Sequence, residues 1–116
     1  MSFEMFSGDT MKIFYSIKDK NGEPLDITGA EVRWEISRLK ATGFSSTPLL
    51  SKTVGAGIEV LDSFDGQILV RLSPSDTLPL SGLFYAELET TDVDGDVSTA
   101  YTGTVTIKKA LIRPTA

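Results

Sequence analysis

The chain contains no histidine and no cysteine, and these two absences exclude whole classes of chemistry. Without histidine, a serine nucleophile would need a lysine, an aspartate or a terminal amine as its base. Without cysteine there is no disulfide and no thiolate metal site, so the fold is indifferent to the redox compartment. The sequence also lacks a G-x-S-x-G elbow and a phosphate-binding loop. Two carboxylates can still meet in space, but no acid stands in an apolar setting that would raise its pKa. We therefore expect a protein that is not an enzyme and binds no cofactor.

Long apolar runs and positive charge are also scarce. No segment approaches the roughly 20 apolar residues of a membrane span, and the N-terminus has neither the basic start nor the apolar run of a signal peptide. Eleven basic residues against 16 acidic ones give a net charge of −5 and a pI of about 4.6. The basic residues are scattered, and Lys108-Lys109 is their densest pair. We therefore expect a cytoplasmic protein with neither nucleic acid nor membrane as a partner.

What the chain does contain is the alternation of apolar and polar residues that is typical of strands. Its 116 residues are the length of one domain. Ser73 and Pro74 indicate a helix start and Pro79 stops it, which predicts one helical turn near residues 74–78. Seven or eight short antiparallel strands with turns between them predict an all-β, two-layer sandwich, with a barrel as the alternative. The predicted strands are Thr10–Lys18, Ala30–Leu39, Leu49–Val54, Ile58–Leu61, Gln67–Leu72, Leu83–Thr91 and Val97–Ile107.

The same alternation predicts the core. Trp34 lies in mid-strand among β-branched neighbours and is interpreted as a core anchor. Residues 40–48, with Phe44 at their centre, show no periodicity and are predicted to form the longest loop. Gly103 suggests a bulge or a close backbone approach in the last strand. The alternating residues Val97, Thr99, Tyr101, Gly103, Val105 and Ile107 are expected to share one face of that strand.

Both ends of the chain carry apolar residues that a partner could cover. Phe3, Met5 and Phe6 form a patch ahead of a turn, and this segment is either a short edge strand or a docking arm spanning residues 1–9. Leu111 and Ile112 belong to a tail, residues 110–116, which is also expected to dock on a partner. Either segment could equally fold onto its own sheet. Residues 1–116 are otherwise taken as one domain.

Asp92, Asp94 and Asp96 form the most site-like cluster in the sequence. Three carboxylates at alternate positions resemble the opening of a calcium loop. The rest of that pattern fails, because position six is Val97 rather than glycine and position twelve is Gly103 rather than glutamate. The simpler interpretation is a hairpin tip in which Asp94-Gly95 supplies the turn, with a calcium site as the alternative.

One long stretch carries a family likeness. Residues 64–107, FDGQILVRLSPSDTLPLSGLFYAELETTDVDGDVSTAYTGTVTI, and residues 26–37, DITGAEVRWEIS, resemble small Ig-like sandwich proteins encoded in tailed-phage and prophage structural clusters. They are also similar to the N-terminal domain of baseplate upper proteins, and the likeness spans residues 10–108. The resemblance implies an Ig-like virion or assembly component of the tail, baseplate or head–tail region. Such a component would act through contacts with other virion or assembly proteins or with a second copy of itself, first in the host cytoplasm and then in the virion.

Two other functions stay open. The first is a carbohydrate-binding sandwich module, for which Phe44, Tyr85 and Tyr101 are the candidate aromatic residues. Two exposed aromatic residues on one flat face would favour it. The second is a bacterial surface Ig-like domain, against which the lack of a secretion signal and of neighbouring repeats argues. Glu87 and Glu89 share an outer strand face with Tyr85, and such a face either binds a partner or is simply solvated.

Overall fold

The computed structural model describes residues 2–40 and 43–111, which form eight strands and one helical turn. The order of the elements confirms the predicted all-β architecture and the single helical turn near residues 74–78. The elements are β1 (Ser2–Phe6), β2 (Met11–Ser16), β3 (Glu31–Lys40), β4 (Gly43–Val54), β5 (Gly57–Asp62), β6 (Gln67–Leu72), α1 (Pro74–Thr77), β7 (Gly82–Thr91) and β8 (Val97–Lys108).

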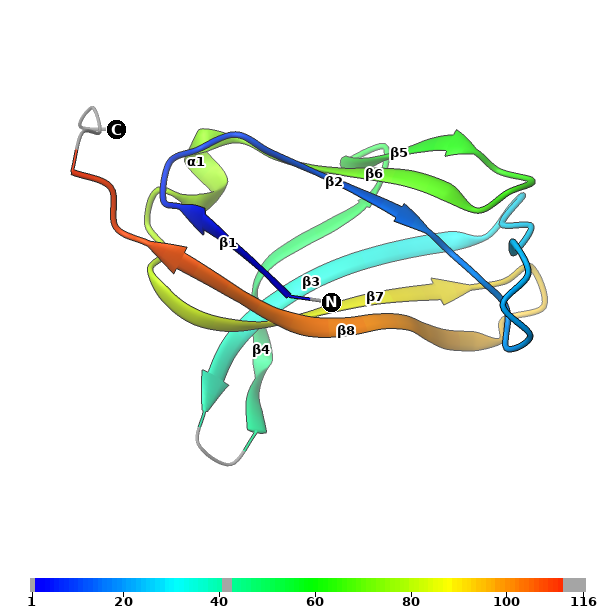
Figure 1. The fold of residues 1–116 in the computed structure, drawn as a ribbon. Coiled ribbons are helices and arrows are strands. Elements are labelled where there is room, and N and C mark those ends of the chain that lie inside the picture. The colour runs from blue at the N-terminus through cyan, green and yellow to red at the C-terminus, as the bar shows by residue number, and fades with distance from the viewer. Residues whose placement is uncertain (1, 41–42, 112–116) are drawn as a thin grey trace.

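The strands form one hydrogen-bonded series that folds over into two layers (Figure 1). The series runs β1-β8-β7-β3-β4-β5-β6-β2. One layer holds β1, β8, β7 and β3, and the other holds β5, β6 and β2. The link is β4, which pairs antiparallel with β3 along most of its length and parallel with β5 at Thr53 and Val54. A sheet of β8, β7 and β3 packed on a sheet of β5, β6 and β2 is the Ig-like sandwich arrangement.

The layers nearly close along their other side, where β2 approaches β8. The Tyr101 hydroxyl donates a hydrogen bond of 2.6 Å to the Ser16 carbonyl oxygen. The rings of Tyr101 and Tyr15 lie beside it with centroids 5.2 Å apart. The molecule is therefore a sandwich whose edges are drawn together, which combines features of the two architectures that the sequence left open.

The core lies between the layers, and Trp34 is its largest fully buried side chain, as predicted. Its indole N–H donates a buried hydrogen bond of 3.0 Å to the Tyr15 hydroxyl, so the polar atom of the largest core residue is satisfied inside the sandwich. The remaining fully buried apolar side chains come from both layers, and they include Ile17, Val32, Ile36, Ile68, Val70, Leu72, Phe84, Leu88, Val105 and Ile107.

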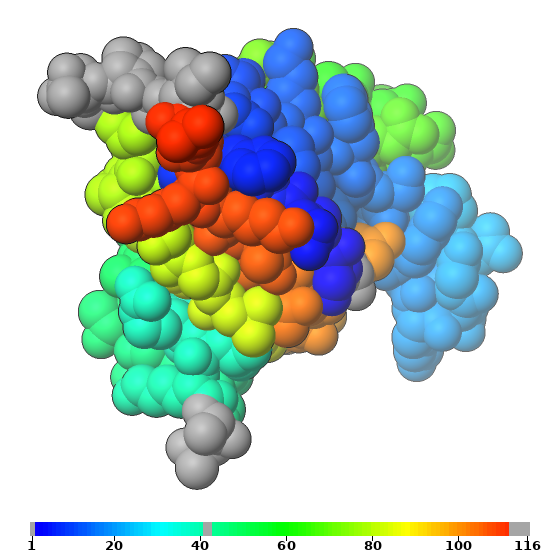
Figure 2. Space-filling view, turned by 60° about the vertical axis from the view of Figure 1, so that its left-hand side comes forward, coloured from blue at the N-terminus to red at the C-terminus, as the bar shows by residue number. Residues whose placement is uncertain are grey.

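Residues 43–48, which were expected in a loop, lie in the first half of β4, so that expectation is wrong. Phe44 pairs with Leu39 and Pro48 pairs with Ser37, which leaves extra residues bulged on β4 between the two pairs. A bulge breaks the period-2 alternation, and for this reason the segment has no strand pattern in the sequence. The β3–β4 hairpin projects from the body of the molecule, as Figure 2 shows.

The bulge in β8 lies at Ala100 rather than at Gly103. Tyr101 pairs with Leu88 and Thr99 pairs with Glu89, so Ala100 is the extra residue, whereas the register is regular across Gly103. Beyond a bulge the alternation changes face. Val97 is accordingly exposed, and the expected common face of this strand is confirmed only for its second half.

Candidate functional site

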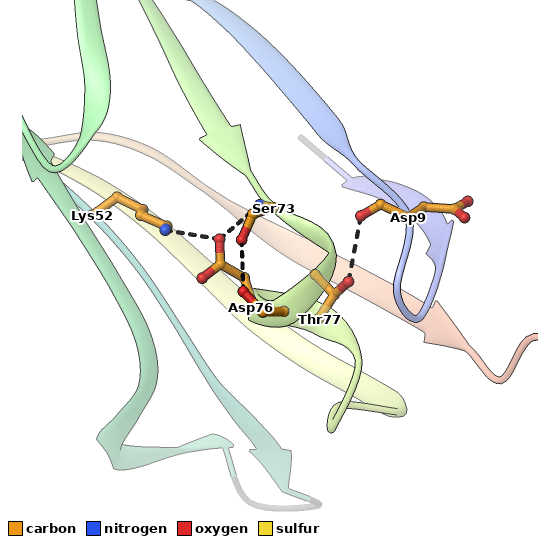
Figure 3. Close-up of polar contacts among 6 residues, drawn as sticks. Asp9, Lys52, Ser73, Asp76 and Thr77 are labelled. Carbon is orange, nitrogen blue, oxygen red and sulfur yellow. Dashed lines mark hydrogen bonds and ion pairs between the residues drawn. The ribbon is translucent and has the colours of Figure 1, made fainter. Parts of the chain in front are cut away.

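Polar side chains meet at the corner where the chain passes from β6 through α1 toward β7 (Figure 3). The Lys52 ammonium group reaches over from β4 and forms an ion pair of 2.8 Å with Asp76 Oδ2. The same oxygen accepts a 2.7 Å hydrogen bond from the backbone N–H of Ser73, the residue that precedes the helix. A carboxylate at the third helical position that reaches back to the residue before the helix is one half of a capping box.

Asp76 is favoured in its ionised form by the groups around it. Partial burial favours the neutral acid, but the hydrogen bonds from Lys52 and Ser73 and the positive charge of Lys52 outweigh it and keep the pKa of Asp76 below its ordinary value. The Ser73 hydroxyl shares a 3.1 Å hydrogen bond with the Ser75 hydroxyl. Serine, lysine and acid therefore meet here, but the lysine contacts the acid, and the Ser73 hydroxyl contacts Ser75. The arrangement fits a structural role.

Thr77 extends this corner to the N-terminal strands. It is fully buried, and its hydroxyl oxygen accepts a 2.9 Å hydrogen bond from the backbone N–H of Gly8. The hydroxyl also lies 3.5 Å from the Asp9 carbonyl oxygen, toward which it donates. Gly8 and Asp9 belong to the turn between β1 and β2, so one threonine fastens that turn to α1.

The Asp92–Asp96 segment forms the tip of the β7–β8 hairpin, where Gly95 has a φ of 87°. Asp92 Oδ1 accepts backbone hydrogen bonds of 2.9 Å from both Asp94 and Asp96, which is the usual role of an aspartate that starts a turn. In residues 2–40 and 43–111, no group of three histidine, cysteine or acidic side chains could hold a metal ion. The calcium alternative gains no support from this geometry.

The N-terminal segment is the edge strand β1, which pairs in parallel with the end of β8. Met5 is buried in the core and Phe3 packs against it, whereas Phe6 remains 48% exposed. In Figure 2 this strand lies along the C-terminal part of β8. Leu111 is fully exposed, and Ile112 lies outside the described residues. Docking of a partner on either segment stays a prediction.

The outer face of β3, β4 and β7 brings together two of the three candidate aromatic residues for carbohydrate binding. Phe44 and Tyr85 stack with ring centroids 4.0 Å apart and an angle of 9° between the ring planes. The Tyr85 hydroxyl lies 3.4 Å from Glu87 Oε1, to which it donates. Partial burial and the neighbouring Glu87 carboxylate raise the pKa of Tyr85. Tyr101 does not join this pair, because its hydroxyl is bound to Ser16.

A hollow of about 200 Å³ lies beside the stacked rings. Glu35 and Glu87 line it together with the two aromatic residues and the bulge of β4. The Glu35 carboxylate accepts a 2.9 Å hydrogen bond from the Ser51 hydroxyl. The alternation of β7 had indicated that Tyr85, Glu87 and Glu89 share a face, but it gave no sign of Phe44, which joins them through β4. We call this hollow the outer-face pocket.

The one helix among the described residues has four residues, and no helix of this part of the chain is long and apolar enough to cross a membrane.

The similarity of this chain to known proteins is distant. No protein-family model matches the sequence, and a search of curated proteins finds no relative. Among solved structures, CopC from Methylosinus trichosporium OB3b is similar with 12% identity and a TM-score of 0.48, over 97% of this chain and 88% of that one. AggA, the major subunit of aggregative adherence fimbriae type I from Escherichia coli, is similar with 12% identity and a TM-score of 0.31, over 93% and 91% of the two chains. The class of the molecule, an Ig-like sandwich, rests on its own strand order.

Proposed function

We propose that this chain is a non-enzymatic structural or assembly component of a phage or prophage particle, in the tail, baseplate or head–tail region. It acts through contacts with other virion or assembly proteins or with a second copy of itself. It works in the host cytoplasm during assembly and then in the virion. The sequence likeness of residues 10–108 supports the assignment to a particle. The surface of the sandwich supports action through protein contacts.

The observation that carries a role in protein contacts is the free side of β4. Up to Lys52, β4 pairs with β3 on one side, and among the described residues no strand pairs with its other side. An unpaired edge can accept a strand from another protein. The edge is not open to every partner, because bulges and Pro48 interrupt it, and such interruptions are how natural sheets prevent indiscriminate pairing. Phe44 and Leu49, which are 51% and 44% exposed, offer apolar contacts beside it.

The polar groups support a role without catalysis. The serine, lysine and acid that meet at α1 are bound to one another in structural contacts. The Asp92 carboxylate supports the hairpin tip. In both clusters the groups that could take part in chemistry hold the backbone in place.

Deletion of the gene in the strain that carries it tests the proposal. We expect lysates of the deletion strain to contain fewer infectious particles, with incomplete tails or baseplates in electron micrographs, and a plasmid copy of the gene to restore them. Mass spectrometry of gradient-purified particles distinguishes a virion protein, which stays with the particle, from an assembly factor, which leaves it. Normal particle numbers and morphology in the deletion strain would refute the proposal.

One observation favours the alternative of a carbohydrate-binding module. Phe44 and Tyr85 lie on one face of the sheet, as that function requires, with carboxylates beside them. Their stacking nevertheless leaves each ring at most one open face. Screening on a glycan array, with a Phe44→Ala variant as the control, tests this alternative. Saturable binding that the variant loses would favour it over the protein-contact proposal.

A further inference from the structure

The outer-face pocket places two like charges opposite each other. Glu35 on β3 and Glu87 on β7 are direct cross-strand partners, and both point away from the core because their neighbours Ile36 and Ala86 are buried. Direct neighbours of this kind have Cβ atoms about 4.5–5.5 Å apart, and like charges at that distance are unfavourable. The ion pairs among the described residues involve other acids, so neither glutamate forms an ion pair with a cation of residues 2–40 or 43–111.

One cation on the same face, Arg33, stands at a different cross-strand position. Arg33 lies two residues before Glu35 and is the cross-strand partner of Glu89, not of Glu87. The Ser51 and Tyr85 hydroxyls donate to Glu35 and Glu87 respectively, which orients the carboxylates without changing their charge. The pocket therefore presents two oriented carboxylates that no cation in the described part of the chain pairs with.

Phe44 adds a π surface to these charges. Its ring stacks on Tyr85, is still half exposed and lines the pocket. A cation over an aromatic face is attracted to it, and arginine is the cation found there more often than lysine. A guanidinium group can stack on a ring and donate paired hydrogen bonds to carboxylates at the same time.

The size of the pocket restricts the ligand further. Its volume of about 200 Å³ is below the roughly 300–1,000 Å³ of sites that enclose a whole small molecule. It is suited to the end of one side chain. The free side of β4 adjoins it, so a partner segment that lies along this edge could place a side chain in the pocket.

We propose that the outer-face pocket binds the guanidinium group of an arginine side chain on a partner protein, with Phe44 as the stacking surface and Glu35 and Glu87 as the acceptors. This inference deepens the proposed function, because it takes the partner to be a protein. It names the chemistry that the partner must present at this contact.

Titration of the isolated protein with small probes, followed by amide NMR shifts, tests the inference. The probes are N-acetyl-arginine amide, its lysine counterpart and the citrulline counterpart, which has nearly the shape of arginine but no charge. We expect saturable shifts around Glu35, Phe44 and Glu87 with arginine, at least threefold weaker binding with lysine and none with citrulline. Added salt should weaken the arginine binding.

Substitutions in the outer-face pocket test which residues bind the arginine probe. The double substitution of Glu35→Gln and Glu87→Gln should abolish arginine binding, and Phe44→Leu should weaken it severalfold while retaining an apolar side chain. Glu59→Gln serves as the matched control, because Glu59 is an acid on the other layer whose loss should change nothing.

Equal binding of arginine and citrulline, or binding that survives the double substitution, would overturn the inference. So would the absence of saturable arginine shifts, and so would a neutral oligosaccharide that binds the same residues in place of arginine. None of these results bears on whether deletion of the gene disturbs particle assembly, so failure of the pocket and failure of the proposed function remain distinguishable.

Discussion

Replacing Asp76 by asparagine should lower the free energy of unfolding by about 2–3 kcal/mol at neutral pH. The estimate lies between the ~0–1 kcal/mol of an exposed ion pair and the ~3–5 kcal/mol of removing one partner from a buried pair. The side chains of Lys52 and Asp76 are 15% and 18% exposed, which places this pair closer to the buried case. For a domain of this size the loss corresponds to a fall in Tm of roughly 8–12 °C.

Most of this loss should come from the Lys52 ammonium group that is left without its partner, not from Asp76 alone. Without the carboxylate the ammonium group is left poorly solvated and unpaired. A Lys52→Met variant should lose less, because its apolar stem is kept and the Asp76 carboxylate left behind still accepts the hydrogen bond from the Ser73 N–H. In the double variant the two losses should not add, and we expect a coupling of about 1–2 kcal/mol. Chemical denaturation with tryptophan fluorescence measures all four proteins, because the buried Trp34 reports unfolding.

The pH dependence supplies an internal control. Because the pKa of Asp76 is lowered in the folded state, its contribution is complete above the pKa of the unfolded chain and is lost as the pH falls through the folded value. The difference between the parent and Asp76→Asn should therefore shrink in acid. Glu59, whose 3.8 Å pair with Arg71 is exposed, should tolerate the change to glutamine within about 0.5 kcal/mol. If Asp76→Asn proves as harmless as Glu59→Gln, the ion pair does not stabilise the fold as argued.

Three further predictions address the core, the N-terminal turn and the outer face. Burial raises the pKa of Tyr15 to about 12, so the parent should lose stability as the pH rises from about 10 to 12, and Tyr15→Phe should lose less over that range. The same variant should cost about 1–3 kcal/mol at neutral pH, because it removes the hydroxyl that accepts the indole N–H of Trp34. Thr77→Val should cost about 1–3 kcal/mol because the Gly8 N–H loses its acceptor, whereas Thr77→Ser should recover most of the loss in urea titrations. Glu87→Gln should increase the free energy of unfolding by about 0.5 kcal/mol and so raise Tm slightly, since it relieves the cross-strand repulsion. A lowered Tm would mean that the charge of Glu87 is compensated within the fold.

Much of the fold could be predicted from local pattern. The alternation in β3 identified Trp34 as a core residue, and it is fully buried. The Ser73-Pro74 pair marked the helix start, and Asp94-Gly95 marked the β7–β8 hairpin, because these residue types encode backbone geometry directly. Such signals depend on neighbours in the sequence and on nothing else.

The candidate site could be predicted only in part, because its contacts join distant segments. Tyr85 and Glu87 were assigned to one face by their own strand. Phe44 reaches Tyr85 from a strand whose bulges erase the alternation, and Lys52 reaches Asp76 from 24 residues away. No local rule encodes either contact. The sequence left open whether the N-terminal segment is an edge strand or an arm for the same reason. The pairing of β1 depends on β8, which lies about 100 residues further on.

The two faces of β4 explain how a small sandwich can both hold its shape and present a binding surface. The inward side chains, Leu50 and Lys52, fasten the strand to the core and to α1. The outward side chain between them, Ser51, donates to Glu35 at the outer-face pocket. Because alternate residues of one strand perform the two tasks, the ion pair with Asp76 fixes the backbone that positions one wall of the pocket. The stability of the α1 corner and the geometry of the proposed arginine site are therefore linked through a single strand.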